Sequence, residues 1–239
     1  ELENEYLREE VTQATSFGEL IGQSAALEAV TRQIDLVAAT DSSVLILGES
    51  GTGKELVARE IHRRSKRSAR PLIKVNCAAV PRELYESEFF GHAKGAFTGA
   101  LRDRVGRFTL ADGGHLLQAT VGEIPLELQA KLLRVPQEGE LERVGEERTR
   151  RVNVRLVAAT NRDLRSEAEA GRFRQDLFYR LSVFPVEVPA LRKRKDDIPV
   201  VAQHFLDVSS RKVGRPKPSL TLAGVQHLQQ YDWPGNVRE

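Results

Sequence analysis

The chain has 239 residues, of which 40% are hydrophobic and 29% are charged, with a net charge of +2. No stretch approaches the roughly 18 apolar residues of a membrane-spanning helix, and no basic-then-apolar leader opens the chain. The single Cys77 can form neither a disulfide framework nor a thiolate metal site, so we expect a cytoplasmic protein without membrane segments. The near-zero net charge argues against a domain that wraps nucleic acid. Because the chain starts at Glu1 rather than Met, we expect it to be part of a longer protein.

Helical and strand patterns alternate along the first three quarters of the chain. Residues 1–16 are polar and helix-favouring, which predicts a linker helix or, equally, a frayed terminus. Residues 25–38 carry apolar side chains at helical spacing. Short uninterrupted apolar runs predict strands that are buried on both faces, at residues 44–47, 72–76, 116–121, 154–160 and 183–188. The sequence therefore predicts an α/β domain over residues 17–189, with three layers and a parallel sheet.

The pattern becomes purely helical after Pro189. Asp196 and Asp197 precede an amphipathic stretch and are predicted to cap its N-terminus. A second helical stretch starts at Leu222, so we expect a small helical domain over residues 190–239. The basic run at residues 192–195 is interpreted as a solvated connection between the two domains, with nucleic-acid binding as the disfavoured alternative.

A glycine-rich loop directly follows the strand predicted at residues 44–47. Glycines let successive N–H groups point into one concavity, a following helix adds positive potential at its N-terminus, and a lysine can reach the outer phosphates of a nucleotide. The spacing G-x4-G-K and the strand–loop–helix context both match a nucleoside triphosphate site; the alternative is a glycine-rich turn without function. The hydroxyl residue that usually follows the lysine is Glu55 here. The candidate nucleotide-binding residues of this loop are Gly48, Glu49, Ser50, Gly51, Thr52, Gly53, Lys54 and Glu55.

Four motifs together carry a family resemblance that covers nearly the whole chain. They read GESGTGKE at residues 48–55, GAFTGA at 95–100, FRQDLFYRL at 173–181 and WPGNVRE at 233–239. The chain resembles the central AAA+ ATPase domain of the bacterial enhancer-binding proteins that activate sigma-54 RNA polymerase. The resemblance implies a P-loop AAA+ domain followed by a helical lid, with ATP or ADP and Mg²⁺ as cofactors. It also implies assembly into a ring, commonly a hexamer, and DNA binding through a C-terminal domain that these residues do not contain.

The GAFTGA hexapeptide places one aromatic ring and one hydroxyl between glycines. Such a loop can be raised and lowered, with Phe97 and Thr98 as exposed contact groups; the alternative is that Phe97 belongs to the core and the glycines make ordinary turns. In the family this loop touches sigma-54 and moves with the state of the nucleotide. The resemblance therefore implies a partner-binding loop made of Gly95, Ala96, Phe97, Thr98, Gly99 and Ala100.

Five further residues receive roles from the resemblance. Asn161 corresponds to the sensor of the γ-phosphate and Asn76 to the switch asparagine, although either could simply cap the end of a strand. Arg174 and Arg180 correspond to arginine fingers that act on a neighbouring subunit, where a guanidinium neutralises charge on the transferred phosphoryl group; solvated arginines are the alternative. Arg238 corresponds to the second sensor in the lid.

The chain departs from the family at two places. The strand that usually ends in an Asp-Glu pair ends here in Ala119 and Thr120. Those carboxylates organise the metal and polarise the attacking water, so no metal ligand is intact at these positions and hydrolysis should be lost or slowed. Glu123 cannot substitute, because it lies three residues further along the chain. Pro136 stands within a helical pattern and predicts a local break.

Three functions follow from these motifs. The leading hypothesis is an AAA+ module of a sigma-54-dependent activator that couples ATP binding and hydrolysis to remodelling of the polymerase through the GAFTGA loop. A hydrolysis-deficient nucleotide-binding regulator of the same family is the first alternative, which Ala119 and Thr120 favour. A scaffold or repressor without nucleotide binding is the second, and an unrelated P-loop motor is disfavoured by GAFTGA.

Overall fold

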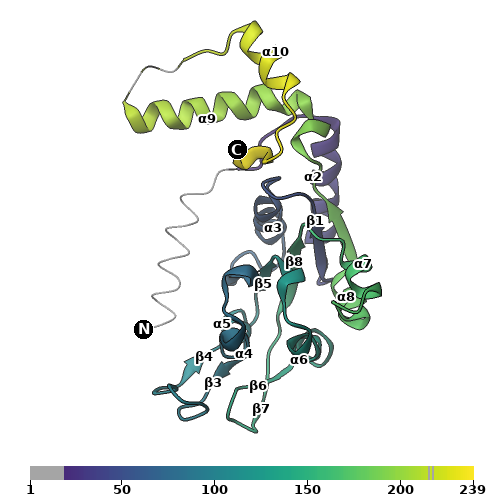
Figure 1. The fold of residues 1–239 in the computed structure, drawn as a ribbon, viewed down its shortest axis with the longest axis vertical. Coiled ribbons are helices and arrows are strands. Elements are labelled where there is room, and N and C mark those ends of the chain that lie inside the picture. The colour runs from purple at the N-terminus through teal and green to yellow at the C-terminus, as the bar shows by residue number, and fades with distance from the viewer. Residues whose placement is uncertain (1–18, 215, 217) are drawn as a thin grey trace.

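The centre of the molecule is a five-stranded parallel sheet with the strand order β2-β5-β8-β1-β9 (Figure 1). The computed structural model describes residues 19–214, 216 and 218–239, so the linker helix predicted for residues 1–16 lies outside the described residues. All four strand pairings are parallel, which confirms the predicted fold class. The strands of the sheet are β1 Val44–Leu47, β2 Leu72–Asn76, β5 His115–Ala119, β8 Arg155–Thr160 and β9 Phe184–Glu187.

Two separate apolar clusters bury the two faces of this sheet. In β1, Val44 and Ile46 face one cluster, whereas Leu45 faces the other, because alternate side chains of a strand point to opposite faces. Both faces of the central strands are thus apolar, which explains the uninterrupted hydrophobic runs in the sequence. One face is covered by α2 Ala25–Ala38 and α3 Lys54–Arg63. The other is covered by α4 Tyr85–Phe90, α5 Arg107–Leu110, α6 Leu126–Glu138, α7 Leu164–Glu169 and α8 Gln175–Leu181.

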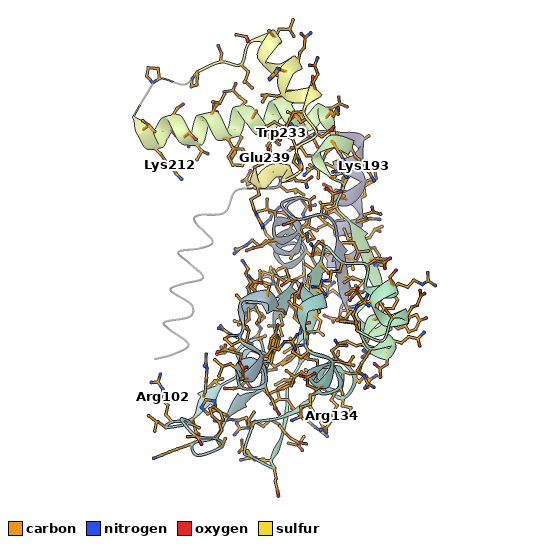
Figure 2. The ribbon with its side chains drawn as sticks, viewed as in Figure 1. Arg102, Arg134, Lys193, Lys212, Trp233 and Glu239 are labelled. Atoms are coloured by element: carbon orange, nitrogen blue, oxygen red, sulfur yellow. The ribbon has the colours of Figure 1, made fainter. Side chains whose placement is uncertain are left out.

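Two short antiparallel hairpins extend from the end of the molecule that lies opposite the lid (Figure 1). The first pairs β3 Gly91–His92 with β4 Arg104–Val105, and the second pairs β6 Glu140–Glu142 with β7 Thr149–Arg151. Strands of two or three residues are too short to show an alternating pattern, so the sequence did not predict them. In Figure 2, Arg102 marks the first hairpin, and Lys193, Trp233 and Glu239 lie at the lid end.

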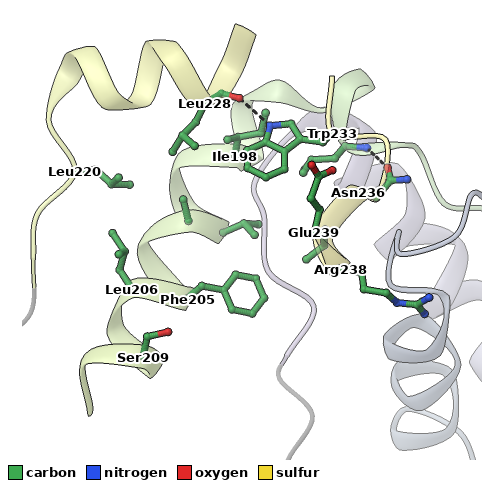
Figure 3. Close-up of a pocket in the computed structure, with 14 residues that line it drawn as sticks. Ile198, Phe205, Leu206, Ser209, Leu220, Leu228, Trp233, Asn236, Arg238 and Glu239 are labelled. Carbon is green, nitrogen blue, oxygen red and sulfur yellow. Dashed lines mark hydrogen bonds between the residues drawn. The ribbon is translucent and has the colours of Figure 1, made fainter. Parts of the chain in front are cut away.

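The lid consists of α9 Ile198–Val213 and α10 Leu222–Gln230, preceded by 3₁₀ turns at Leu191–Lys193 and Lys195–Asp197 and followed by one at Asn236–Arg238. Asp197 occupies the N-cap position of α9, as predicted, but its side chain makes no capping hydrogen bond. The carboxylate accepts hydrogen bonds from Gln23 and Ser24 instead. Between α9, α10 and the last turn lies an apolar groove of about 550 Å³ (Figure 3). Within the described part of the chain, no helix is long and apolar enough to cross a bilayer.

The helix α6 continues past Pro136, contrary to the predicted break. Pro136 falls in the last turn of α6. Gly139, three residues after the proline, ends the helix in a left-handed conformation with φ +68°. Because so little helix follows the proline, the missing backbone hydrogen bond does not end the helix early.

Candidate nucleotide-binding site

The glycine-rich loop occupies residues 48–53, between the carboxyl end of β1 and the first turn of α3. Gly53 lies at the helix N-cap with φ +98°, a left-handed conformation that glycine adopts without a steric penalty. The half-buried Lys54 donates from Nζ to the carbonyl oxygens of Gly48 and Glu49, both at 2.7 Å. Burial, followed by the nearby charge of Arg238, lowers the pKa of Lys54 to about 8. The loop therefore folds around a cation at a helix N-terminus, which suits a phosphate group.

The lid lies directly on this loop. Gly51 has φ +82°, and a Cβ atom there would lie 2.0 Å from the carbonyl oxygen of Gly235, so only glycine permits this approach. The amide of Val237 donates to Gly51 O at 3.1 Å. The guanidinium of Arg238 donates to Ser50 Oγ at 3.2 Å and points away from the apolar groove of the lid (Figure 3). The structure thus brings the predicted Arg238 to the predicted loop.

Glu49 joins the loop to the lid through its carboxylate. Arg192 donates to both of its oxygens, and Asn236 Nδ2 donates to Oε2 at 3.2 Å. The hydrogen bond from Arg192 and then that from Asn236 lower the pKa of Glu49 to about 2. The arginine-rich connection is therefore not simply solvated, as the sequence suggested, since Arg194 also donates to Thr52 O at 3.0 Å. In the sequence, only the basic run at residues 192–195 drew attention to Arg192 and Arg194. A run of positive charge does not indicate which residues the arginines contact.

The remaining loop side chains are already engaged. The buried Thr52 hydroxyl donates to Glu49 O at 2.9 Å. Glu55, at the position where a hydroxyl residue is usual, accepts a hydrogen bond from Lys74 Nζ at 2.6 Å and another from Arg59 at 3.4 Å. The backbone and Lys54 therefore remain the main candidates for phosphate binding in this loop.

Asn76 and Ala119 lie side by side at the carboxyl ends of β2 and β5, where they are register partners. Thr120 follows with φ 56°, and its hydroxyl lies 3.1 Å from Asn76 Oδ1 and accepts a hydrogen bond from Ala78 N at 3.0 Å. The predicted switch asparagine therefore contacts the residue that stands in place of the second carboxylate. Glu123, three residues further along the chain, forms an ion pair with Arg162 at 2.5 Å.

This part of the site does not fit a magnesium ion. Mg²⁺ is bound through carboxylates together with phosphates and water. The methyl group of Ala119 offers no ligand, and the Thr120 hydroxyl is held by Asn76 and Ala78. Across the described ranges, no group of three His, Cys, Asp or Glu side chains is arranged to hold a metal ion.

Asn161 is exposed directly after β8, whose residue Ala159 is the register partner of Ala119. It therefore lies at the same sheet edge as Asn76 and the loop. Arg174 is the N-cap of α8 and Arg180 lies in its last turn, and both residues are exposed. Arg174 pairs with Asp176 at 2.6 Å, and Arg180 donates to Pro136 O. These two arginines are thus held by groups outside the glycine-rich loop.

The GAFTGA segment forms the tip of the β3–β4 hairpin. Gly95 N donates to Ala100 O at 2.8 Å, which closes the loop. Phe97 is 40% exposed, with its ring 5.0 Å from that of His92, and Thr98 is exposed as well. The second hairpin lies beside the first and supports it, since the amide of Ala93 donates to Val144 O at 3.0 Å.

The glycine-rich loop, the parallel sheet and the helical lid define a P-loop module of the AAA+ class. A model of the sigma-54 interaction domain matches residues 20–187, and a model of the AAA+ ATPase lid domain matches residues 192–239. The chain belongs to the sigma-54 interaction domain family, as its motifs predicted.

Several curated transcription regulators are similar to the chain. The DNA-binding transcriptional activator HyfR of Escherichia coli K12 is 53% identical over 237 residues, which cover 99% of this chain and 35% of that protein. The anaerobic nitric oxide reductase transcription regulator NorR of Klebsiella pneumoniae 342 is 54% identical over 221 residues, covering 92% of this chain and 43% of that protein. The chain thus spans less than half the length of these two relatives.

A similar solved structure is that of NtrX from Brucella abortus in complex with ATP. It superposes with a TM-score of 0.86 at 38% identity, covering 99% of this chain and 51% of that chain. The same protein in complex with ADP gives the same TM-score and identity.

Proposed function

We propose that this chain is the nucleotide-binding AAA+ module of a sigma-54-dependent transcriptional activator. In this function, ATP binding and hydrolysis move the loop of residues 95–100, which remodels sigma-54 RNA polymerase. The observation that carries the proposal is the contact of one glycine-rich loop with both α3 and the lid, through Lys54 and Arg238. Residues 17–189 and 190–239 are the two domains of this proposal, and the buried free thiol of Cys77 suits the cytoplasm.

The residues that would hold the nucleotide have matching chemistry. The backbone of residues 48–53 and the start of α3 provide N–H donors, and Lys54 and Arg238 provide positive charge near the phosphates. The ATP and ADP complexes of the similar protein NtrX support the same ligands here. Asn161 and Asn76 would report the state of the nucleotide from the sheet edge.

Assembly into a ring, commonly a hexamer, would complete the site. Arg174 and Arg180 are exposed and held away from the loop of their own chain, so a neighbouring subunit is the place where they could meet a phosphate. DNA binding would belong to a separate C-terminal domain of the parent protein.

A second candidate function is a regulator that binds ATP or ADP, with Mg²⁺ in solution, without turning it over at an appreciable rate. The geometry at Ala119 and Thr120 favours it, because a methyl group and an engaged hydroxyl cannot polarise water. Loop movement would then follow nucleotide binding and release alone.

Calorimetry and phosphate release together test both candidates. The chain should bind ATP and ADP, and Lys54→Ala should abolish that binding. Turnover on the order of 1 per second, an ordinary enzymatic rate, would exclude the second candidate. Restoring Ala119→Asp and Thr120→Glu together should raise turnover about 100-fold or more.

A matched control comes from Glu123. Its carboxylate is paired with Arg162, so Glu123→Gln in the restored chain should leave turnover within about twofold. A large loss in this control would show that Glu123 takes part in water activation.

A further inference from the structure

Arg194 lies in the connection between the two domains and is 3% exposed. One guanidinium nitrogen donates to the carbonyl oxygen of Thr52 at 3.0 Å, and another lies 3.8 Å from Asp197 Oδ2. Burial lowers the pKa of this guanidinium, and the Asp197 carboxylate opposes that effect. A buried charge of this kind persists only where its partners are fixed.

Asp197 is fully buried and connects this arginine to the segment before α2. Its Oδ1 accepts from the amides of Gln23 and Ser24 at 2.6 and 2.7 Å, and its Oδ2 accepts from Ser24 Oγ at 2.7 Å. The fit is close, because a Cβ atom on Gly22 would lie 2.6 Å from Asp197 Cγ. Three segments far apart in sequence are therefore joined by two side chains.

The other end of this link is the glycine-rich loop itself. Thr52 is 1% exposed, and its carbonyl immediately precedes Gly53 and Lys54. Fixing that carbonyl orients the peptide between Thr52 and Gly53, and this peptide sets how the loop enters α3. Arg194 is buried and donates to this backbone carbonyl, so we expect it to act on a bound phosphate through the position of the loop.

We propose that Arg194 is a positioning residue for nucleotide binding, and that with Asp197 it couples the segment before α2 to the conformation of the glycine-rich loop. The proposal rests on the nucleotide binding proposed above. A ligand in the loop and a change at Gln23 or Ser24 then affect each other through one buried link, with equal coupling in both directions.

The test compares two buried arginines of similar environment. Arg194→Lys keeps the positive charge, but a single ammonium group cannot span Thr52 O and Asp197 as the guanidinium does. Arg155 provides the matched control: it is 2% exposed and donates to Val37 O at 2.7 Å and Ser42 O at 3.0 Å, on backbone outside the loop. Both substitutions disturb a buried arginine that binds backbone carbonyls, but only Arg194 contacts the glycine-rich loop.

Calorimetric titration of the full chain with ADP and with ATP gives the first readout. Arg194→Lys should weaken both by about tenfold, whereas Arg155→Lys should lower the melting temperature and leave both affinities within about twofold. Asp197→Asn keeps an oxygen for the two amides and removes the charge that faces Arg194, so it should weaken both nucleotides in the same direction. In the double variant, the loss of nucleotide affinity should be smaller than the sum of the losses in Asp197→Asn and Arg194→Lys, because the two side chains act as one link.

Hydrogen exchange gives a readout that general destabilisation does not produce. In the natural chain, ADP should slow exchange of the Gln23 and Ser24 amides, and Arg194→Lys should remove this effect at saturating ADP. If the natural chain binds ADP and Arg194→Lys binds it equally, or if exchange at Gln23 and Ser24 ignores ADP, the coupling is refuted while the proposed function stands. If the natural chain binds neither nucleotide, the proposed function is refuted, and the coupling that rests on it is refuted as well.

Discussion

His115 lies at the first position of β5 with no exposed surface, and its nearest polar neighbours are also basic. Its Nδ1 lies 2.8 Å from His62 Nδ1, and its Nε2 lies 3.4 Å from the guanidinium of Arg155. Burial is the largest cause that lowers the pKa of His115 to about 3, followed by the charges of His62, Arg155 and Arg67, while Asp41 opposes them. Burial also lowers the pKa of His62. Both imidazoles therefore take up a proton less readily in the folded protein than in the unfolded chain, His115 most of all.

The lowered pKa of His115 predicts a loss of stability in mild acid. The unfolded chain binds a proton at each histidine near pH 6.5, whereas folded His115 does not until about pH 3. The free energy of unfolding should therefore decrease as the pH falls below 6.5, by about 1.4 kcal/mol per pH unit for His115. Urea unfolding between pH 7.5 and 5 measures this slope, and His115→Gln should be less sensitive to pH by that amount. Equal slopes would show that His115 takes up a proton in the folded state.

The loop of residues 95–100 depends on two hairpins rather than one. A Cβ atom on Gly145, at the turn after β6, would lie 2.5 Å from Ala96 Cβ, so the second hairpin is closely packed against the first. The helix α6 leads directly into this second hairpin, and its Pro136 carbonyl accepts a hydrogen bond from Arg180. The end of α6 thus lies between a proposed arginine finger and the support of the proposed contact loop.

Replacing the proline in this helix should stabilise the chain. Pro136→Leu adds a backbone donor for the carbonyl of Leu132 and removes the clash of the ring with that carbonyl. The free energy of unfolding should rise by about 1–3 kcal/mol. A proline in a helix interior costs about 3 kcal/mol, and Pro136 lies in the last turn, so the gain should not exceed that value. Urea denaturation measures the change, with Gln137→Ala at the neighbouring exposed position as a control that should stay within about 0.5 kcal/mol. A decrease in stability for Pro136→Leu would mean that the local backbone is fitted to proline.

The candidate nucleotide site lies near the lid, and the hairpin that carries the proposed contact loop lies at the opposite end of the molecule (Figures 1 and 2). The carboxyl end of β1 leads into the glycine-rich loop that contacts the lid, and the carboxyl end of β5 leads through α6 into the second hairpin. The arginines of α8 are exposed on another part of the surface. This separation suits a module that acts between neighbouring copies.

Mixing two defective chains tests whether the arginines act between subunits. A variant with Ala119→Asp, Thr120→Glu, Arg174→Ala and Arg180→Ala has the restored carboxylates without the fingers, whereas the natural chain has the fingers without the carboxylates. An equimolar mixture should release phosphate at least tenfold faster than the sum of the separate chains, since a finger contributes through the transition state of the neighbouring site. Turnover equal to that sum would place the arginines outside the neighbouring site.

Much of the fold and part of the site could be predicted from sequence. The strands at 44–47 and 72–76 and the helix at 25–38 have the observed bounds, because burial on both faces or on one helical face leaves a clear pattern. The glycine-rich loop was predicted by spacing and context. The hairpins were not predicted because their strands are too short to leave a pattern, and the continuation of α6 was missed because Pro136 falls in its last turn. The partners of Arg192 and Arg194 were not predicted because they lie on distant segments.

The sequence by itself determined the family, the order of the elements and the absence of two expected carboxylates at Ala119 and Thr120. These are properties of residue type and spacing, so they can be found without coordinates. Only the tertiary structure decided that Thr120 contacts Asn76, that Glu123 is occupied by Arg162, and that Asp197 binds the segment before α2 rather than its own helix. The physical reason is that these polar side chains pair with groups on distant segments, and packing rather than local pattern brings those groups together. The need for a partner is strongest for the buried Asp197.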